Sequence, residues 1–349
     1  MTAFVESLPT VSVLGYIQLS NDDNGNIATA SDLKIAALKN FDIYYRGAWV
    51  KKSDLPIYFA DSEVKRLCVE NWDTNKDGEL SYSEAAAVTD LGRVFYYNET
   101  IKSFDELQHF TALKTIGEYA FYTCEKLTSI TLPNSVTNIG DYAFDECSSM
   151  TSITLPNSVT NIGDFAFEDC SLMTSITLPN SVTNIGDYAF CDCSSMTSIT
   201  IPDSVESIGD NICGECLNLS AIYGKFATDD NRCLIVDGVL NSVAPAGLTE
   251  YVIPSGVTEI SECTFYELTN FTSITIPESV SKINASAFEK CTRLTSVYCK
   301  PTTPPAGDNG MFGSNAPDRK IYVPTASVEA YKSAEYWRAY ADAIVGYDF

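Results

Sequence analysis

The stretch Thr128–Met150 reads TSITLPNSVTNIGDYAFDECSSM, and the chain repeats it in a fixed frame. Thr151–Met173 matches it at 19 of 23 positions, and Thr174–Met196 matches it at 21 of 23. Looser copies in the same frame are Asp105–Leu127, Thr197–Leu219, Thr249–Phe271 and Thr272–Leu294. A period of 23 residues lies within the range of roughly 20–29 that is typical of leucine-rich repeats.

The pattern inside one repeat predicts a coil that contributes a small share of a common core. Ile130 and Leu132 alternate with polar residues, which predicts a short strand with one buried face. Pro133 ends this strand, because proline has no N–H to give to a ladder. The other inward positions are expected at Val136, Ile139, Ala143, Phe144 and Cys147. Because one coil cannot close its own core, we expect a solenoid of stacked coils, mainly short parallel strands and turns, with a cap at each end.

The phrase LPNSVTNIGDYAFDECSSMTSI resembles the BspA-type leucine-rich repeat of surface proteins from anaerobic gut and oral bacteria. The resemblance covers about Asp105 to Phe349, including an irregular unit at Ser220–Leu248 and the tail Lys320–Tyr331. It implies a leucine-rich-repeat solenoid. Since members are described as adhesins or host-interaction proteins, it also implies a scaffold at the cell surface or secreted, which binds a host or bacterial protein.

Four parts are expected along the chain. They are a small α+β adapter at 1–60, an EF-hand-like calcium-binding cap at 61–104, the repeats at 105–300 with their irregular unit at 220–248, and a C-terminal cap at 301–349. In the adapter we expect a strand at 11–19, a turn at 20–31, a helix at 34–39 and a hairpin at 43–50. In the C-terminal cap we expect a strand at 321–323 and an amphipathic helix at 327–343.

The segment Asp73-Thr-Asn-Lys-Asp-Gly-Glu-Leu-Ser-Tyr-Ser-Glu84 fits the calcium-loop pattern D-x-[DN]-x-[DN]-G-x5-E, and it resembles an EF-hand or dockerin-type loop. The expected ligands are side-chain oxygens of Asp73, Asn75, Asp77 and Glu84, the carbonyl oxygen of Glu79, and a water held by Ser81. The alternative is an acidic turn without a metal. No second loop with carboxylates at both ends pairs with it, so a structural calcium in the N-terminal cap is expected rather than a sensor.

Charge narrows the classes of partner. The chain has 46 Asp and Glu against 22 Lys and Arg, a formal net charge of −24. Half of that excess lies in Thr128–Leu219, which contains twelve acidic residues and no Lys or Arg. This excludes a binder of the nucleic-acid backbone, which needs clustered cations. No run reaches the roughly 18–20 apolar residues of a membrane span. No signal peptide is visible, so either the protein stays inside the cell or a leader peptide has been removed.

The cysteines indicate core positions rather than a disulfide framework. Six of the twelve fall at one repeat position, which Leu268 occupies in another coil; they are Cys124, Cys147, Cys170, Cys193, Cys216 and Cys291. A position that accepts Cys or Leu is apolar, so we expect buried free thiols.

Catalysis is not expected. The single histidine, His109, leaves little room for histidine-dependent mechanisms. The paired carboxylates Asp145-Glu146 and Glu168-Asp169 recur by repeat, whereas a catalytic pair should occur once. We therefore interpret them as surface columns and expect a protein that is not an enzyme.

Three outward columns are candidates for binding. The first is a Ser/Thr stripe that includes Thr131, Thr154 and Thr177; the second is Asp141, Asp164 and Asp187; the third is Tyr142, Phe165 and Tyr188. The leading hypothesis is a protein partner, and the alternative is a carbohydrate that uses the Ser/Thr and aromatic columns. The structural alternative is hydrogen bonding and packing between equivalent turns.

Overall fold

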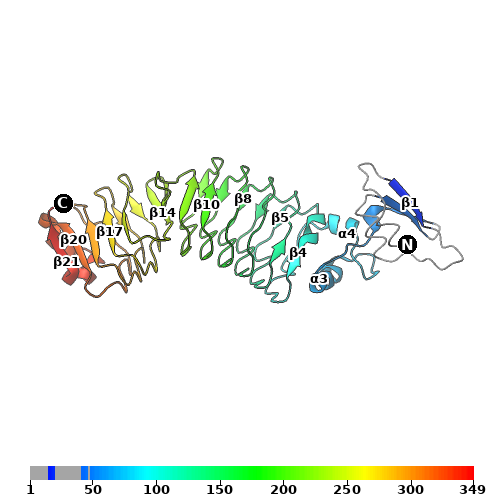
Figure 1. Cartoon of the computed structure of the whole chain (residues 1–349), viewed down its shortest axis with the longest axis horizontal. Coiled ribbons are helices and arrows are strands. Elements are labelled where there is room, and N and C mark those ends of the chain that lie inside the picture. Colours follow the sequence, from blue (N-terminus) through cyan, green and yellow to red (C-terminus); the bar gives the residue numbers. More distant parts are fainter. Residues whose placement is uncertain (1–14, 20–40, 46–47) are drawn as a thin grey trace.

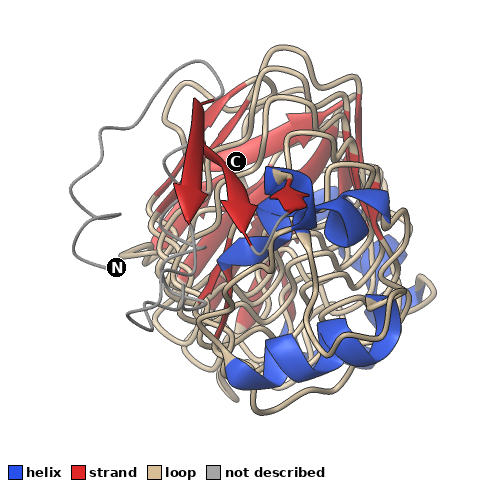
Figure 2. Ribbon diagram, turned by 90° about the vertical axis from the view of Figure 1, so that its right-hand side faces the viewer, coloured by secondary structure: helices blue, strands red, loops and turns tan. Residues whose placement is uncertain are grey.

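The computed structural model describes residues 15–19, 41–45 and 48–349. Figure 1 shows an elongated solenoid in which the coils follow one another in sequence order, with helices α3 and α4 beside its first coil and the C-terminus at the opposite end. Viewed after a 90° turn, the coils overlap one another along the long axis (Figure 2). The predicted turn at 20–31, the helix at 34–39 and the start of the strand at 11–19 lie outside the described residues.

The described part of the N-terminal adapter is a small sheet. Strand β1 (Gly15–Leu19) pairs in parallel with β2 (Phe41–Tyr45), and β2 pairs antiparallel with β3 (Ala48–Val50). The predicted hairpin at 43–50 is therefore confirmed, as is the end of the predicted first strand. A 3-10 turn, η1 (Lys52–Asp54), leads from this sheet toward the first helix.

The solenoid carries two rows of short strands, one on each side of the coil. The first row follows the Ser-Ile-Thr segments: β4 (Ser103–Phe104), β6 (Ser129–Ile130), β10 (Ser198–Ile201), β12 (Ala221–Gly224), β15 (Glu250–Val252), β17 (Ser273–Ile276), β19 (Ser296–Cys299), β20 (Lys320–Pro324) and β21 (Ile344–Tyr347). The second row is β5 (Thr115–Ile116), β7 (Asn138–Ile139), β8 (Asn161–Ile162), β9 (Asn184–Ile185), β11 (Ser207–Ile208), β16 (Glu259–Ile260) and β18 (Lys282–Ile283).

Register within these rows follows the repeat. Asn138 lies opposite Asn161, and Asn161 lies opposite Asn184, in parallel pairs one repeat apart. In the coils with the shortest strands, the first row reduces to a single parallel bridge between Thr154 and Thr177. The predicted solenoid of short parallel strands is confirmed.

The core is a set of ladders that run along the solenoid. Val136, Ile139, Ala143, Phe144 and Cys147 are all fully buried, as predicted. Each phenylalanine ring stacks on its equivalent one coil away, with Phe121 and Phe144 centroids 5.3 Å apart and nearly parallel. Apolar burial of this kind stabilises coils that have no internal ion pairs.

The irregular unit divides the core into two clusters. It forms an antiparallel hairpin of β13 (Cys233–Val236) and β14 (Val239–Val243) in place of an ordinary turn. Asn241 and Ser242 from this hairpin hydrogen-bond to the backbone of Ile212 and Cys213 in the preceding coil. On one side of the coil the sheet ends at β12 and a new sheet begins at β15, while on the other side β14 pairs in parallel with β16. The regular turn of the repeat is missing there.

The N-terminal cap packs helices onto the first coil. Helix α3 (Ser62–Trp72) begins at Asp61, whose carboxylate accepts the N–H groups of Glu63 and Val64. Helix α4 (Tyr82–Ala87) follows the loop and ends at Val88. The first coil begins with the 3-10 helix η2 (Asp105–His109). The Trp72 ring contacts that of Phe110 edge-on, with centroids 5.5 Å apart. The cap and the first coil therefore share one hydrophobic core.

The C-terminal cap corrects one prediction. The strand at 321–323 is confirmed as part of β20, but the single helix at 327–343 is wrong. Instead the chain forms η3 (Thr325–Ser327), α5 (Val328–Ser333) and η4 (Trp337–Ala343), and then returns to the sheet as β21. The helix ends at Ser333 because Ala334 is extended, with a ψ of 148°, and Tyr336 then adopts a φ of 62°. Trp337, which follows, is buried, and its indole N–H donates to the carbonyl oxygen of Pro305 at 2.8 Å.

Candidate functional site

The predicted calcium loop folds around its own backbone. One carboxylate oxygen of Asp73 accepts the N–H of Lys76 at 2.6 Å, and the other accepts the N–H of Gly78 at 2.8 Å. The side chains of Asn75 and Asp77 each accept the N–H two residues further on. Gly78 has a φ of 85°, a conformation that glycine adopts without strain. These turns bend the segment tightly between α3 and α4.

Glu84 holds the end of the loop. Its Oε1 accepts the N–H and hydroxyl of Thr74, both at 2.9 Å, and its Oε2 accepts the N–H of Ser81 at 2.9 Å. Burial would raise the pKa of Glu84, but hydrogen bonds from Ser81, Thr74 and Asn75 outweigh it and lower the pKa to about 2. This carboxylate is therefore ionised at any physiological pH.

The loop residues accept hydrogen bonds without converging on one point. Within the described part of the chain, no three His, Cys, Asp or Glu side chains form a group that could hold a metal ion. The side chain of Glu79 is paired with Lys65 at 2.7 Å, and the loop is tied to the preceding segment by an antiparallel bridge between Ser81 and Pro56. The donor set has the chemistry of a calcium loop, but binding would require the loop oxygens to turn toward one point and Glu84 to exchange its backbone partners for the ion.

The aspartate column links the coils to one another. The carboxylate of Asp141 accepts the N–H of Asp164 at 3.0 Å, and that of Asp164 accepts the N–H of Asp187 at 2.8 Å. Asp187 does the same for Asp210 at 2.8 Å. Because each carboxylate satisfies a backbone donor of the next coil, this column is engaged in holding the stack together.

The aromatic column is also engaged within the protein. The rings of Tyr142 and Phe165 stack nearly parallel with centroids 4.8 Å apart, and those of Phe165 and Tyr188 lie 5.0 Å apart. Since Tyr142 also stacks on Tyr119 at 4.8 Å, both faces of Tyr142 and of Phe165 lie against neighbouring rings, and one face of Tyr188 lies against Phe165. The Ser/Thr stripe is more open: Thr131, Thr154 and Thr177 are exposed, and Thr131 donates to Asp105 at 2.9 Å.

The cysteine ladder is buried and reduced. All twelve cysteines lie within the described residues as free thiols, and only Cys263 is partly exposed. The ladder thiols also donate to carbonyl oxygens of the preceding coil, as Cys147 does to Phe121 at 3.3 Å and Cys170 to Phe144 at 3.3 Å. The sequence predicted the burial but not these weak hydrogen bonds.

A run of carboxylates follows the turn between the phenylalanine and cysteine ladders. We call it the acidic stripe, and its members are Asp145, Glu146, Glu168, Asp169, Asp192 and Glu215. Within the described part of the chain none of the six forms an ion pair. Burial together with the like charges of neighbouring coils raises the pKa of Asp145 and of Glu168 to about 7. The same causes raise the pKa of Asp169 and Asp192.

The structure corrects one detail of this stripe. Asp145, interpreted from sequence as part of a surface column, is only 5% exposed. It interacts with the like charges of Glu168 and Glu146, and none of the ion pairs among the described residues includes it. A carboxylate in this position stabilises the stripe only when protonated or when a cation approaches.

The stripe continues at its N-terminal end into a tyrosine cluster that the sequence did not single out. Tyr122 precedes Asp145 in the same repeat position, and its ring stacks on that of Tyr96 at 5.5 Å. Tyr97 is 55% exposed and Tyr96 is 40% exposed. Arg93 lies 4.7 Å from the ring centre of Tyr119, at the base of the cluster. The repeat frame could have revealed this cluster, since Tyr122 occupies the column of Asp145 and Glu168.

No helix in the ranges that the structure describes combines the length and the apolar composition needed to cross a membrane. The longest, α3, has 11 residues and carries four charged side chains.

Comparison with known proteins supports the fold. A leucine-rich cell surface protein from Faecalibacterium prausnitzii A2-165 is similar with a TM-score of 0.55 and 24% identity, over 74% of this chain and 81% of that one. The pneumococcal vaccine antigen PcpA is similar with a TM-score of 0.52 and 19% identity, over 62% of this chain and 61% of that one. At these identities the likeness shows a shared fold. No curated protein matches the chain.

The family comparison covers more than half of the chain. Six copies of the BspA type leucine rich repeat region match residues 91–228 and 244–333. The match begins before the first repeat that the sequence frame suggests, which agrees with the stacking of the Phe95 ring on Phe121 at 5.2 Å. The gap at 229–243 coincides with the β13–β14 hairpin. The chain therefore belongs to the BspA-type leucine-rich repeat family.

Proposed function

We propose that this protein is a non-enzymatic interaction scaffold at the cell surface or secreted, and that its acidic stripe and tyrosine cluster bind a basic segment of a protein partner. The observation that carries this proposal is the stripe itself, a row of carboxylates that have no ion-pair partner among the described residues, and in which the pKa values of Asp145 and Glu168 are raised to about 7. Similarity to a leucine-rich cell surface protein supports the location.

A basic partner would relieve the repulsion that the stripe imposes on itself. Equivalent carboxylates in neighbouring coils are separated by about one strand spacing, near 5 Å, which is less than the Debye length of about 8 Å at physiological salt. Lysine or arginine side chains laid along the stripe would neutralise these charges. The neighbouring tyrosines add flat, partly exposed rings, over which an arginine or lysine is attracted by the π face.

Tyrosine and arginine are also the residue types that dominate binding energy at protein interfaces. The cluster of Tyr96, Tyr97 and Tyr122 would therefore anchor the partner, and the stripe would orient the basic segment along the coils by charge complementarity. This division predicts that the tyrosines control dissociation and that the carboxylates control the rate of association and its salt dependence.

A structural calcium ion in the N-terminal cap is a second part of the proposal. Its support is the loop pattern of Asp73–Glu84 and the turns that Asp73, Asn75 and Asp77 already form. The loop lies between α3 and α4, both of which pack on the first coil. An ion held there would stabilise the cap and through it the exposed end of the solenoid.

Carbohydrate binding is the alternative, and the stacked column gives it little support. A sugar stacks on the face of an aromatic ring, whereas the faces of Tyr142, Phe165 and Tyr188 lie against one another. If a sugar binds, the exposed rings of Tyr96 and Tyr97 are the better platform.

A titration with a blocked lysine- and arginine-rich peptide tests the proposed function. Binding should be saturable, should weaken as salt rises from about 50 to 500 mM, and should fall when Tyr97 is changed to Ala. An acidic peptide of the same length should not compete. Absence of binding at low salt would contradict the proposal, and binding that Tyr97→Ala leaves unchanged would remove the tyrosine cluster from it.

A further inference from the structure

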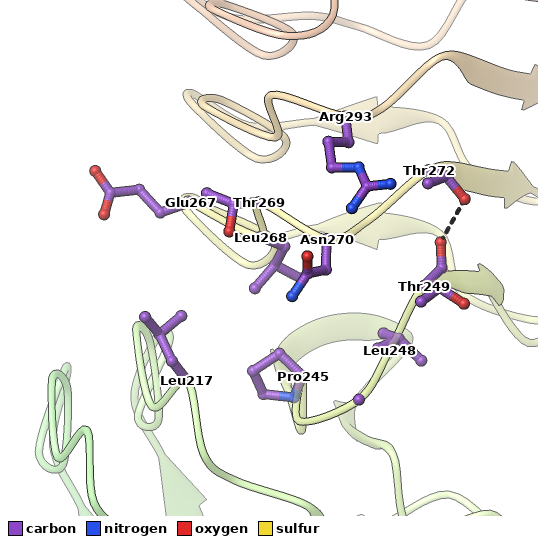
Figure 3. A pocket seen from close by; sticks show the side chains of 11 residues that line it. Leu217, Pro245, Leu248, Thr249, Glu267, Leu268, Thr269, Asn270, Thr272 and Arg293 are labelled. Atoms are coloured by element: carbon purple, nitrogen blue, oxygen red, sulfur yellow. Dashed lines mark hydrogen bonds between the residues drawn. The ribbon is translucent and has the colours of Figure 1, made fainter.

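A cleft of about 370 Å³ opens where the irregular unit interrupts the solenoid. It lies between the coil that ends at Leu219 and the coil that begins at Thr249, with Leu217 and Pro245 on one side and Leu268, Asn270 and Arg293 on the other (Figure 3). The regular turn that would fill this space is absent, because β13 and β14 form a hairpin instead. Its volume falls within the range typical of ligand pockets.

The apolar wall of the cleft departs from the repeat. Leu217 is 44% exposed, and the equivalent positions in the three preceding coils are serines, Ser148, Ser171 and Ser194. Leucine therefore replaces serine at this position in the coil that ends at Leu219, next to the irregular unit in which the hairpin stands in place of the regular turn. Together with Pro245 and Leu248, both half-buried, it forms an apolar surface that a neighbouring coil does not cover.

Two polar side chains face this apolar wall without partners. Neither the guanidinium of Arg293 nor the side-chain amide of Asn270 has a hydrogen bond or ion pair within the described part of the chain. The other charged residue that lines the cleft, Glu267, is paired with Lys290 at 2.6 Å. Arg293 is thus an uncompensated positive charge at the rim of an apolar cleft, in a chain with a net charge of −24.

We propose that this cleft binds a peptide segment of a partner protein in which a carboxylate lies next to a branched aliphatic side chain. The aliphatic group would occupy the wall formed by Leu217, Pro245 and Leu248, and the carboxylate would accept a bidentate pair of hydrogen bonds from Arg293. Asn270 can donate to the same carboxylate or to the peptide backbone. A segment with one carboxylate fits better than an acidic run, because the net charge of the chain repels a polyanion.

This site is separate from the acidic stripe, whose ligand carries the opposite charge. Neutralising Glu146 and Glu168, stripe residues that do not line the cleft, should leave binding at the cleft unchanged, so failure of one proposal does not imply failure of the other.

The test uses the full chain and the blocked tetrapeptide acetyl-Ala-Leu-Asp-Ala-amide, with Asn in place of Asp, or Ser in place of Leu, as matched probes. Calorimetry should give a Kd on the order of 10⁻⁴ M for the parent peptide, about tenfold weaker for the Asn peptide, and weaker again for the Ser peptide. Arg293→Gln should weaken the parent peptide about tenfold and abolish the difference between the Asp and Asn peptides.

Two further variants keep the result interpretable. Leu217→Ser installs the residue found in equivalent coils, so the fold should be retained while binding falls about threefold or more. Arg338→Gln changes another exposed arginine, in the C-terminal cap, and should have no effect. The proposal is overturned if the parent peptide shows no binding at several times the expected Kd, if it binds no better than the Asn peptide, or if Arg293→Gln leaves its affinity unchanged.

Discussion

The thiol of Cys170 donates to the carbonyl oxygen of Phe144 in the preceding coil, across 3.3 Å. The same bond recurs from coil to coil, so the cysteine ladder holds the stack both by apolar packing and by a weak hydrogen bond. Burial raises the pKa of the ladder thiols, to about 12 for Cys124 and Cys291, which keeps them protonated and unreactive.

This arrangement predicts the reactivity of the thiols. Native protein treated with a maleimide should be modified at Cys263 at most, since it is the one partly exposed cysteine, and Cys263→Ser should abolish the reaction. In denaturant without reductant all twelve should react, as mass spectrometry would count. Fewer than twelve would indicate disulfides, and native modification of ladder positions would contradict the packing described here.

A second prediction concerns the glycine that recurs at one repeat position, as Gly117, Gly140, Gly163, Gly186 and Gly209. A Cβ added at Gly186 would lie 2.5 Å from the backbone nitrogen of Asp164 and 2.3 Å from its carboxylate. At the equivalent Gly117 the nearest atom is a side-chain oxygen 3.9 Å away. Gly186→Ala should therefore cost about 1–3 kcal/mol of unfolding free energy in urea, whereas Gly117→Ala should cost little. Equal effects would mean that the close approach between coils is not what selects glycine.

A third prediction concerns pH. The pKa of Asp145 is raised to about 7 by burial and by Glu168 and Glu146, above an unfolded value near 4. The folded state then binds a proton more tightly than the unfolded state, so this contribution to stability is full below about pH 4 and is lost as pH rises through 7. Thermal unfolding should show a lower Tm at pH 8 than at pH 5.5.

Asp145→Asn should remove much of that difference and raise the stability at pH 8 by about 1–2 kcal/mol. Asp203→Asn, which changes an exposed carboxylate outside the stripe, should leave the pH dependence as it is. A stability that rises between pH 5.5 and 8 in the parent protein would contradict the assignment.

A fourth prediction concerns calcium. At a hundred times its Kd the ion should stabilise the chain by about 2.7 kcal/mol relative to EGTA, and the Tm should rise accordingly. Asp73→Asn removes a charged ligand but keeps an oxygen that can accept the N–H of Gly78, so the shift should largely disappear. Glu79→Gln should keep the shift, because that residue is expected to bind through its backbone carbonyl. Identical melting curves with calcium and with EGTA would contradict the proposal that the loop binds calcium.

Much of the fold follows from the sequence because each core position occurs several times, once in every repeat. The inward positions of Phe144 and Cys147 could be predicted from one coil and checked against the next. The interruption of the C-terminal helix could not be predicted in this way. The positive φ of Tyr336 accompanies the burial of Trp337, and this tertiary packing leaves no trace in the local hydrophobic periodicity. The loop of Asp73–Glu84 is predicted by its pattern, and its calcium remains a prediction.

The candidate binding surfaces were harder to predict. The repeat pattern places the columns of Asp164 and Phe165 on the outside of the solenoid. In the structure, however, Asp164 accepts a backbone N–H of the next coil and Phe165 stacks on Tyr188, because equivalent positions in adjacent coils are close enough to contact each other. The cleft beside Leu217 depends on a missing turn, which only the three-dimensional arrangement of the irregular unit reveals.

The most direct test of the central claim compares two variants that remove equal charge. The stripe variant carries Glu146→Gln, Glu168→Gln, Asp169→Asn and Asp192→Asn, and the control variant carries Glu206→Gln, Glu278→Gln, Asp203→Asn and Asp318→Asn, all at exposed positions outside the stripe. The affinity of each for the basic peptide would be measured at pH 8 and low salt. We expect the stripe variant to bind at least tenfold more weakly than the parent, and the control variant within about twofold of it. Equal losses in both would show that net charge, rather than the stripe, attracts the peptide, and would contradict the account.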